Sequence, residues 1–538
     1  MPPTHEVTNQ PPPLLDHDVA AGDAALVEAV ARHGADPDTL RELGELAGTE
    51  RAERWAAEAN RYPPVLRTHD RYGNRIDEVD FHPAWHELMR VAVGAGLHGT
   101  PWVSTAPAPH LTRAARFYLW SQVEAGHGCP ISMTYAVVPA LRAEPALAAT
   151  YLPGLTATGY DPGLRPAAAK AGLLAGMAMT EKQGGSDVRA NTTQAVPASD
   201  GRYRLTGHKW FCSAPMCDLF LVLAQAEGGL TCFLVPRVLP DGSRNTFRLQ
   251  RLKDKLGNRS NASAEVEFEQ TAGWRVGSEG RGVPTILEMV TMTRLDCVLG
   301  SAAAVRAATA QAIHHATHRR AFGRPLREQP LMRAVLADLA VEAEAGTALA
   351  VRLASTVDTG ETELGRLATA VGKFWMCKRA AAVTAEALEC LGGNGFVEDS
   401  GMPRLYREAP LNSIWEGAGN VIALDVLRAL GRQPESVAAF LAEVEAAAGA
   451  DARLDAAVKR LRGEIADAEA IETRARRVAG LMAVCLQGSL LVRYAPPAVA
   501  DAFCASRLDG DWGWVLGTLP PGLDLAAIVD RAAPLPDR

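Results

Sequence analysis

The chain has 538 residues, of which 48% are hydrophobic and 22% charged, and its formal net charge is −7. These proportions are typical of a soluble globular protein with several domains, and the negative net charge excludes a global electrostatic attraction for nucleic acid. The nine cysteines form no C-x-x-C pair, which indicates reduced thiols in a cytoplasmic protein rather than a disulfide framework.

The N-terminal region is predicted to be an extended arm followed by helices. Residues 1–20 hold Pro11, Pro12 and Pro13 among polar residues, which favours an extended arm that could drape over a neighbour. Residues 21–175 are predicted to be a helical domain, as the helical spacing of apolar residues in 111–125 illustrates. We expect no signal peptide and no membrane segment, because there is neither a basic leader nor an uninterrupted apolar run of sufficient length.

Residues 176–280 are predicted to form an antiparallel β domain. Side chains alternate between apolar and polar from Tyr203 to His208, and short apolar runs at 219–223, 231–235 and 264–268 are typical of strands. Gly228-Gly229 and Asp241-Gly242 supply turn signals between these runs.

Helices are expected to return after Gly282, at about 284–318, 331–358, 364–391 and 419–430. The sequence Arg432-Gln433-Pro434 indicates a boundary, so residues 281–431 are predicted to be a helical bundle and 432–538 a second helical domain. This order of segregated helices and strands is an α+β, mainly α, arrangement. Domain junctions of this kind are common ligand sites.

Two segments carry candidate chemistry. From Met177 to Asp187, Gly184-Gly185 forces a turn, while the hydroxyls of Thr180 and Ser186 could hold the edge of a planar heterocycle and a phosphate. A polar hairpin turn is the alternative interpretation of this segment.

The second segment is Trp415 to Asn420, which places one carboxylate, Glu416, among small residues ahead of an apolar helix. Small residues allow close approach of a ligand, and the helix start favours negative charge. Glu416 is therefore a candidate base for a weakly acidic C–H bond, or alternatively a simple complement to the helix dipole.

Five segments, in the same order, resemble elements of the acyl-CoA dehydrogenase family. They are 177–187 (flavin-binding signature), 209–213 (strand that stacks on the flavin), 320–323 (R-x-F-G), 391–395 (glycine loop) and 415–417 (catalytic base). Within that family, the strings 179–188, 251–262 and 413–417 and the C-terminal extension resemble the AidB-type alkylation-response flavoproteins over nearly the full chain.

The resemblance implies the acyl-CoA dehydrogenase fold, with an N-terminal helical domain, a middle antiparallel β-barrel-like domain and a helical bundle, plus a C-terminal helical extension. It also implies FAD and a homotetramer that shares FAD sites between subunits, with Arg320 pairing with the pyrophosphate of FAD bound mainly by a neighbour. The FAD contacts implied are Met179, Thr180, Gly185, Ser186, Trp210, Phe211, Ser213, Arg320, Phe322, Gly392, Gly393, Gly417 and Asn420.

By the same resemblance, Glu416 would remove the α-proton of an acyl-CoA or related acyl thioester while the β-hydrogen leaves as hydride to the flavin. Trp415 and Arg428 would line the substrate pocket and narrow it, which would make turnover on ordinary acyl-CoAs weak. Without the resemblance, Trp210 and Phe211 would be core aromatics and Arg428 an exposed helix charge.

Other roles remain open from the sequence. The resemblance links the C-terminal domain to double-stranded DNA, and the basic positions there are Lys459, Arg460, Arg462, Arg474, Arg476 and Arg477. Acidic residues interrupt these clusters, so a solvated helix face is the favoured interpretation. The alternative function is a DNA-binding alkylation-damage response flavoprotein with vestigial dehydrogenase activity. A third, a flavin-dependent oxidase or monooxygenase acting on a nitro compound, typically uses an Asp base, and Glu416 argues against it.

No metal site is predicted. His314, His315 and His318 lie on one expected helix, but no carboxylate or cysteine stands at suitable spacing on the same face.

Overall fold

The computed structural model describes residues 4–511, 513 and 515–535. The first three residues of the predicted arm and the last three of the predicted C-terminal domain therefore lie outside the described residues. The chain forms two compact units. The helical unit contains the residues up to Glu50, His110–Val123 and the chain from Cys297 onward, and the mixed unit contains Arg51–Pro109 and Glu124–Asp296. The predicted N-terminal domain thus contributes to both units, and the five-domain division stays a prediction.

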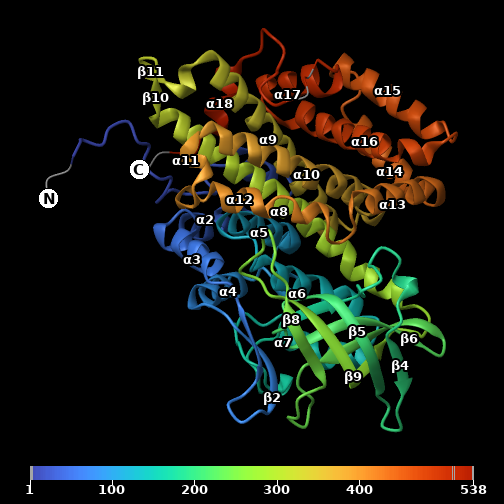
Figure 1. Ribbon diagram of the computed structural model, residues 1–538. Coiled ribbons are helices and arrows are strands. Elements are labelled where there is room, and N and C mark those ends of the chain that lie inside the picture. Colours follow the sequence, from blue (N-terminus) through green and yellow to red (C-terminus); the bar gives the residue numbers. More distant parts are fainter. Residues whose placement is uncertain (1–3, 512, 514, 536–538) are drawn as a thin grey trace. The chain divides into compact units, whose positions relative to one another are not determined.

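The helical unit is a bundle of long helices (Figure 1), in which α10 packs against α9, α13, α14 and α16. The four helices expected after Gly282 are confirmed to within a few residues. Helix α9 starts with Pro330 and ends at Thr359, and Gly360, whose φ is 69°, forms the left-handed cap expected of a C-terminal glycine. The α-helices of the helical unit are α1 (Ala24–Arg32), α2 (Arg41–Ala47), α5 (Pro109–Val123), α8 (Gly282–His318, which begins in the mixed unit), α9 (Pro330–Thr359), α10 (Thr362–Cys390), α11 (Gly393–Phe396), α12 (Met402–Glu408), α13 (Gly419–Arg432), α14 (Pro434–Glu445), α15 (Ala452–Ala466), α16 (Ile471–Tyr494), α17 (Pro497–Phe503) and α18 (Leu525–Ala532). The unit also has a small hairpin of β10 (Arg320–Ala321) and β11 (Arg324–Pro325).

The mixed unit holds a seven-stranded sheet with a few helices. The sheet order is β3-β6-β4-β5-β9-β7, with β8 paired to β9, and an additional pairing of β6 with β7 closes it into a barrel-like ring. Closure removes exposed strand edges. Its elements are α3 (Glu50–Arg61), β1 (Val65–His69), β2 (Arg75–Asp80), α4 (Pro83–Gly94), α6 (Gly128–Leu141), α7 (Pro145–Leu155), β3 (Ala175–Ala178), β4 (Gln194–Pro197), β5 (Tyr203–Ser213), β6 (Leu219–Ala226), β7 (Gly229–Pro236), β8 (Phe247–Leu252) and β9 (Ser263–Val276).

The core of this sheet is aromatic and aliphatic. Phe220, Phe247 and Phe268 come from three different strands and meet with ring centroids 4.8 and 5.5 Å apart. Leu219 to Ala224 of β6 are all completely buried, which explains why this strand appears in the sequence as a continuous apolar run. The four expected strands and the α+β fold are confirmed.

The structure also differs from the sequence expectations. Strands β1 and β2 form an antiparallel hairpin inside the region predicted to be helical. Their side chains are mostly polar and half-exposed, so no apolar alternation marked them, and the turn is held by Asp70, which accepts hydrogen bonds from the N–H groups of Tyr72 and Asn74. The short strands β3, β4 and β8 were not expected, and β3 pairs with β6 in parallel rather than antiparallel fashion.

Helix α16 also departs from expectation, because its length and composition alone would allow it to cross a membrane. Within the described part of the chain it is the one helix with this property, and 72% of its apolar window is buried inside the protein. An apolar helix that other helices surround is a normal core helix.

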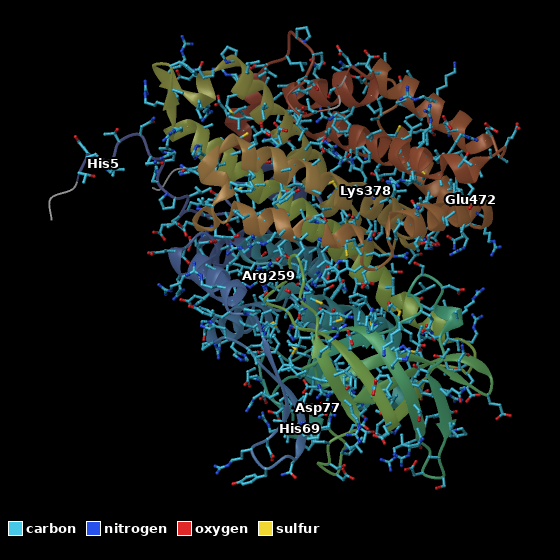
Figure 2. The ribbon with its side chains drawn as sticks, in the orientation of Figure 1. His5, His69, Asp77, Arg259, Lys378 and Glu472 are labelled. Atoms are coloured by element: carbon cyan, nitrogen blue, oxygen red, sulfur yellow. The ribbon has the colours of Figure 1, made fainter. Side chains whose placement is uncertain are left out.

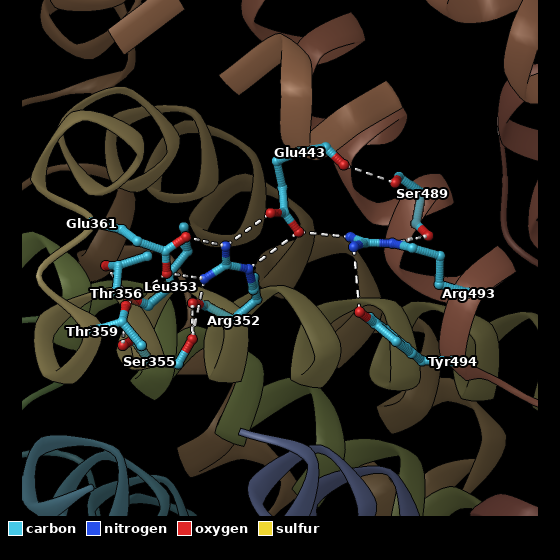
Figure 3. Close-up of polar contacts among 10 residues, drawn as sticks. All are labelled: Arg352, Leu353, Ser355, Thr356, Thr359, Glu361, Glu443, Ser489, Arg493 and Tyr494. Carbon is cyan, nitrogen blue, oxygen red and sulfur yellow. Dashed lines mark hydrogen bonds and ion pairs between the residues drawn. The ribbon is translucent and has the colours of Figure 1, made fainter. Parts of the chain in front are cut away.

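An ion-pair network joins α14 and α16 to the rest of the helical unit (Figure 3). The guanidinium of Arg352, on α9, donates to Glu361 (2.8 Å) and to Glu443 of α14 (2.8 Å), and Glu443 also accepts from Arg493 of α16 (2.6 Å). Only 9% of the Arg352 side chain and 12% of the Glu443 side chain are exposed. The network therefore fixes where the C-terminal helices dock.

Replacing Arg352 with Met is expected to lower the thermal midpoint by a few degrees at pH 7, because breaking a buried pair costs about 3 kcal/mol. Hydrogen bonds from Arg352 lower the pKa of Glu361 to about 2. Burial works to raise the pKa of Glu443, but Arg352 and Arg493 outweigh it and lower that pKa. Carboxyls with a lower pKa in the folded state stabilise it above pH ~4.5, and this contribution is lost as the pH falls toward 2. Thermal melts should therefore show the effect of the substitution shrinking over that interval.

The matched control is Arg41→Met, which breaks an exposed pair with Asp38 and should cost under about 1 kcal/mol. An equal destabilisation by Arg352→Met at pH 7 and pH 3 would contradict the assignment of acid sensitivity to this network.

Candidate functional site

The predicted site residues fall into two groups, one in each unit. In each group, a buried lysine that the sequence analysis did not name as a site residue fixes one segment: Lys209 in the mixed unit and Lys373 in the helical unit. The group in the mixed unit consists of Met179, Thr180, Gly185, Ser186, Trp210, Phe211 and Ser213, and the group in the helical unit consists of Arg320, Phe322, Gly392, Gly393, Trp415, Glu416, Gly417, Asn420 and Arg428.

The loop from Met179 to Ser186 follows β3 and is attached to β5. The backbone N–H of Trp210 donates to the carbonyl oxygen of Thr180 (2.8 Å). A Cβ atom added at Gly185 would lie 2.4 Å from Oγ1 of Thr180, so only glycine allows this loop to fold back on the threonine. Thr180 and Gly185 are half-buried and Ser186 is exposed, which leaves hydroxyl groups at the surface of the loop.

A buried ion pair lies under this loop. The ammonium of Lys209 donates to Glu181 (2.8 Å) and to the carbonyl oxygen of Leu223 (2.8 Å), while Glu181 also accepts from the N–H of Thr192 (2.7 Å). Both side chains of the pair are 0% exposed. Burial lowers the pKa of Lys209 to about 8, and the hydrogen bonds of Lys209 and Thr192 overcome burial to lower the pKa of Glu181. The sequence carried a signal for this pair, because Lys209 continues the inward-facing positions of β5 from Leu205.

The two aromatic residues of β5 form a partly open surface. Trp210 is half-buried, and Phe211 is 52% exposed, so Phe211 is not the core aromatic of the alternative interpretation. Nζ of Lys253 lies 3.2 Å from the Trp210 ring centroid and 4.8 Å from that of Phe211. An exposed ring on a strand, with the half-buried Ser213 two positions further on, offers a flat apolar face beside a hydroxyl group, which fits a planar cofactor.

In the helical unit, Glu416 occupies a strained turn just before α13. Its φ is 57°, a left-handed conformation that costs a non-glycine residue about 1 kcal/mol or more, and Gly417 follows with a φ of 107°. The ammonium of Lys373, a residue of α10 that is 1% exposed, donates to the carbonyl oxygens of Trp415 (2.9 Å) and Gly417. The carbonyls on either side of Glu416 are thus fixed by one buried cation.

The indole of Trp415 is fixed as well. Its Nε1 donates to Oδ1 of Asn412 (2.8 Å), and the amide of Asn412 donates in turn to Oγ of Ser301 on α8 (3.1 Å). Strained backbone concentrates at functional sites and persists where surrounding contacts hold it, as they do here. Neither Lys373 nor Asn412 was predicted from the sequence.

Two cations gather at the first turn of α13. Nη1 of Arg476 lies 3.4 Å from Oδ1 of the exposed Asn420. A Cβ atom at Gly419 would lie 2.6 Å from Cε of Lys378, whose side chain is marked in Figure 2. Burial lowers the pKa of Lys378, and Arg476 and Lys373 lower it further. The positive end of the helix and these cations together favour an anionic group.

Arg428 lies two turns further along α13. Its guanidinium is 3.5 Å from Asp425 on the same helix, and 62% of its side chain is exposed. Its predicted role in narrowing the substrate pocket stays a prediction.

The hairpin β10–β11 and the glycine loop present residues outward. Phe322 is 97% exposed and has a φ of 50°, and Gly323 follows with a φ of 83°. A Cβ atom added at Gly392 or Gly393 would meet nothing within 4 Å in the described chain. This open space fits the close approach of another body, such as a neighbour's bound FAD.

A pocket in the mixed unit lies at the beginning of β3 and contains none of the predicted site residues. Its empty space is about 570 Å³ including open solvent, and its walls include Lys170, Asp218, His86 and Tyr160. Lys170 pairs with Asp218 (2.6 Å), and Nδ1 of His86 lies 2.8 Å from the Tyr160 hydroxyl, so these polar groups are satisfied by one another.

The histidines and the basic cluster have structural contacts. Nε2 of His314 lies 2.9 Å from the carbonyl oxygen of Pro12, and within the described residues no group of three metal-ligating side chains occurs. In the C-terminal helices, Arg462 pairs with Glu445, and both Arg474 and Arg477 pair with Glu464.

Comparisons with known proteins show the family of the chain. Three family models match the chain: the adaptive response protein AidB N-terminal domain over residues 9–162, the acyl-CoA dehydrogenase middle domain over 176–271 and the acyl-CoA dehydrogenase C-terminal domain over 280–431. AidB of Escherichia coli (strain K12) is 48% identical over 517 residues, covering 94% of this chain and 95% of that protein. Acyl-CoA dehydrogenase family member 11 of Caenorhabditis elegans is 30% identical, covering 87% of this chain and 83% of that protein.

Solved structures of related proteins also match this chain over most of its length. ACDH-11 of Caenorhabditis elegans in complex with C11-CoA superimposes with a TM-score of 0.85 at 27% identity, covering 95% of each chain. The apo form of Bd2924 has a TM-score of 0.83 at 29% identity, covering 90% of this chain and 99% of that one. This chain therefore belongs to the acyl-CoA dehydrogenase family, in its AidB branch.

Proposed function

We propose that this protein is an FAD-dependent acyl-CoA dehydrogenase in which Glu416 removes the α-proton of an acyl thioester. The observation that carries the proposal is the backbone at Glu416, which is strained and held by Lys373 through the carbonyls on both sides. A base must be held within reach of its proton, and fixing the peptide units around Glu416 limits where its carboxylate can go.

Different residues of the chain are proposed to bind different parts of the cofactor and the substrate. Thr180 and Ser186 offer hydroxyls to the cofactor, Phe211 and Trp210 offer an aromatic face, and the start of α13 with Asn420 and Arg476 suits an anionic group. Bound FAD would supply the two-electron acceptor for the hydride that leaves the β-carbon. The α-proton goes to Glu416, so the substrate loses one proton and one hydride and gains a carbon–carbon double bond.

The direct test is anaerobic mixing of the flavin-loaded protein with a panel of straight and branched acyl-CoAs. Chains up to eleven carbons belong in the panel, because the relative ACDH-11 was solved with C11-CoA. Bleaching of the oxidised flavin absorbance by at least one thioester is the expected result. A protein that holds FAD but stays oxidised with the whole panel would contradict the proposed activity.

DNA binding by the C-terminal domain is the weaker candidate. Phosphates would have to compete with Glu445 and Glu464 for the arginines that these carboxylates already pair with. A gel-shift titration of double-stranded DNA over a salt series tests it. Affinity that falls steeply with salt would support phosphate contacts, and affinity that is absent or independent of salt would exclude them.

A further inference from the structure

The N-terminal arm binds the hairpin that carries Arg320. The side-chain amide of Asn9 makes two reciprocal hydrogen bonds with one residue: Nδ2 donates to the carbonyl oxygen of Arg320 (2.8 Å), and the N–H of Arg320 donates to Oδ1 (2.8 Å). The guanidinium of Arg319 donates to the backbone carbonyl oxygen of Asn9 (2.6 Å). The asparagine amide thus pairs with the first strand of the hairpin as a neighbouring strand would.

Asparagine suits this position for two physical reasons. Only a primary amide offers a donor and an acceptor side by side, so it can satisfy both the N–H and the C=O of Arg320. Asn9 also has a φ of 58°, a left-handed conformation that asparagine tolerates better than most residues.

The arm continues from the hairpin to the glycine loop. The amide of Asn394 donates to Oε1 of Gln10 (3.1 Å), and His314 at the end of α8 lies 2.9 Å from the carbonyl oxygen of Pro12. Three arm residues, Asn9, Gln10 and Pro12, therefore contact the hairpin, the glycine loop and the end of α8. The family resemblance implies that the hairpin and the glycine loop contact FAD, with Arg320 reaching the FAD of a neighbouring subunit.

The hairpin needs such support. Each of its strands has two residues, and its turn places the bulky Phe322 in a left-handed conformation while 97% of the residue is exposed. A two-stranded hairpin is marginal in water on its own, and strain of this kind persists only when contacts hold it.

We propose that Asn9 is a positioning residue that fixes the Arg320–Phe322 hairpin for contact with the FAD held by a second copy of the chain. This inference rests on the proposed function, because it assumes that the protein binds FAD, and on the family resemblance, which implies that Arg320 reaches the FAD of a neighbouring subunit. It assigns the arm a role in cofactor retention through its own subunit's hairpin, instead of the predicted draping over a neighbour.

The experiment measures how fast FAD leaves the assembled protein, followed by the rise in flavin fluorescence on dilution. Asn9→Asp keeps the size of the side chain but removes the Nδ2 donor. Asn9→Ala removes both the Nδ2 donor and the Oδ1 acceptor. Both are expected to speed FAD release about tenfold, as the loss of one or two hydrogen bonds would. His5→Ala is the matched control, because His5, labelled in Figure 2, lies in the same exposed arm. Its ring contacts the neighbouring Thr4 rather than the hairpin.

A double-mutant cycle separates positioning from general destabilisation. If Asn9 acts through the hairpin, Asn9→Ala should add almost nothing to the FAD release rate of Arg320→Ala, and the thermal midpoint of the apoprotein should match that of the wild type. Additive effects, or variants that release FAD at the wild-type rate, would overturn the inference while leaving the proposed function intact. If the wild-type protein takes up no FAD, both this inference and the proposed function are wrong.

Discussion

Glu416→Gln is expected to abolish flavin bleaching by acyl-CoA while FAD stays bound. The amide keeps the shape of the side chain but cannot accept the α-proton, and loss of a general base lowers rates by about 10²–10⁴-fold. The measurement is stopped-flow absorbance of the flavin band under anaerobic conditions, with the most reactive thioester of the panel. The visible spectrum and the FAD content of the variant should equal those of the wild type.

Glu435→Gln is the control for this change, because it neutralises an exposed carboxylate in the first turn of α14. It should leave the bleaching rate unchanged. If Glu416→Gln bleached as fast as the wild type, the proton would have to go to another group, and the proposed role of Glu416 would be wrong.

Lys373→Met is expected to lower the rate of flavin reduction about 100-fold without removing FAD. The substitution keeps much of the volume of the side chain but leaves the carbonyls of Trp415 and Gly417 without their donor. The strained backbone at Glu416 then loses its support, and a misplaced base costs rate even when its chemistry is intact. The same stopped-flow assay, run alongside a thermal melt, measures both consequences.

The effect of Lys373→Met on the stability of the protein must be separated from its effect on the position of Glu416. A buried carbonyl that loses its hydrogen-bond donor lowers the free energy of unfolding by about 1–3 kcal/mol. Val371→Ala, in the same buried helix, should destabilise the protein by a comparable amount without touching the turn at Glu416. Lys373→Arg should restore part of the rate if the buried cation matters. A Lys373→Met protein no slower than Val371→Ala would show that the lysine is only structural.

Much of the fold could be predicted from local patterns. Helical spacing of apolar residues predicts the long helices α8, α9 and α10, and a continuous apolar run predicts the buried strand β6. Burial produces both patterns in the sequence. The hairpin β1–β2 could not be predicted in this way. Its two strands are polar and half-exposed, so the sequence shows no apolar alternation. The pairing of the strands with each other and the turn held by Asp70 stabilise them instead.

The same division applies to the candidate site. The sequence alone determined which segments are proposed to carry the chemistry, including Glu416, Thr180 and the aromatic pair of β5, because short motifs of unusual composition can be recognised in local order. Only the tertiary structure revealed Lys373 beneath the Glu416 turn, Lys209 beneath the loop from Met179 to Ser186 and Asn9 against the Arg320 hairpin. These contacts join residues from 28 to 311 positions apart, counted from Lys209–Glu181 to Asn9–Arg320. A buried charge or an amide finds its partner through chain folding, so its role depends on which backbone groups the fold brings within hydrogen-bond distance.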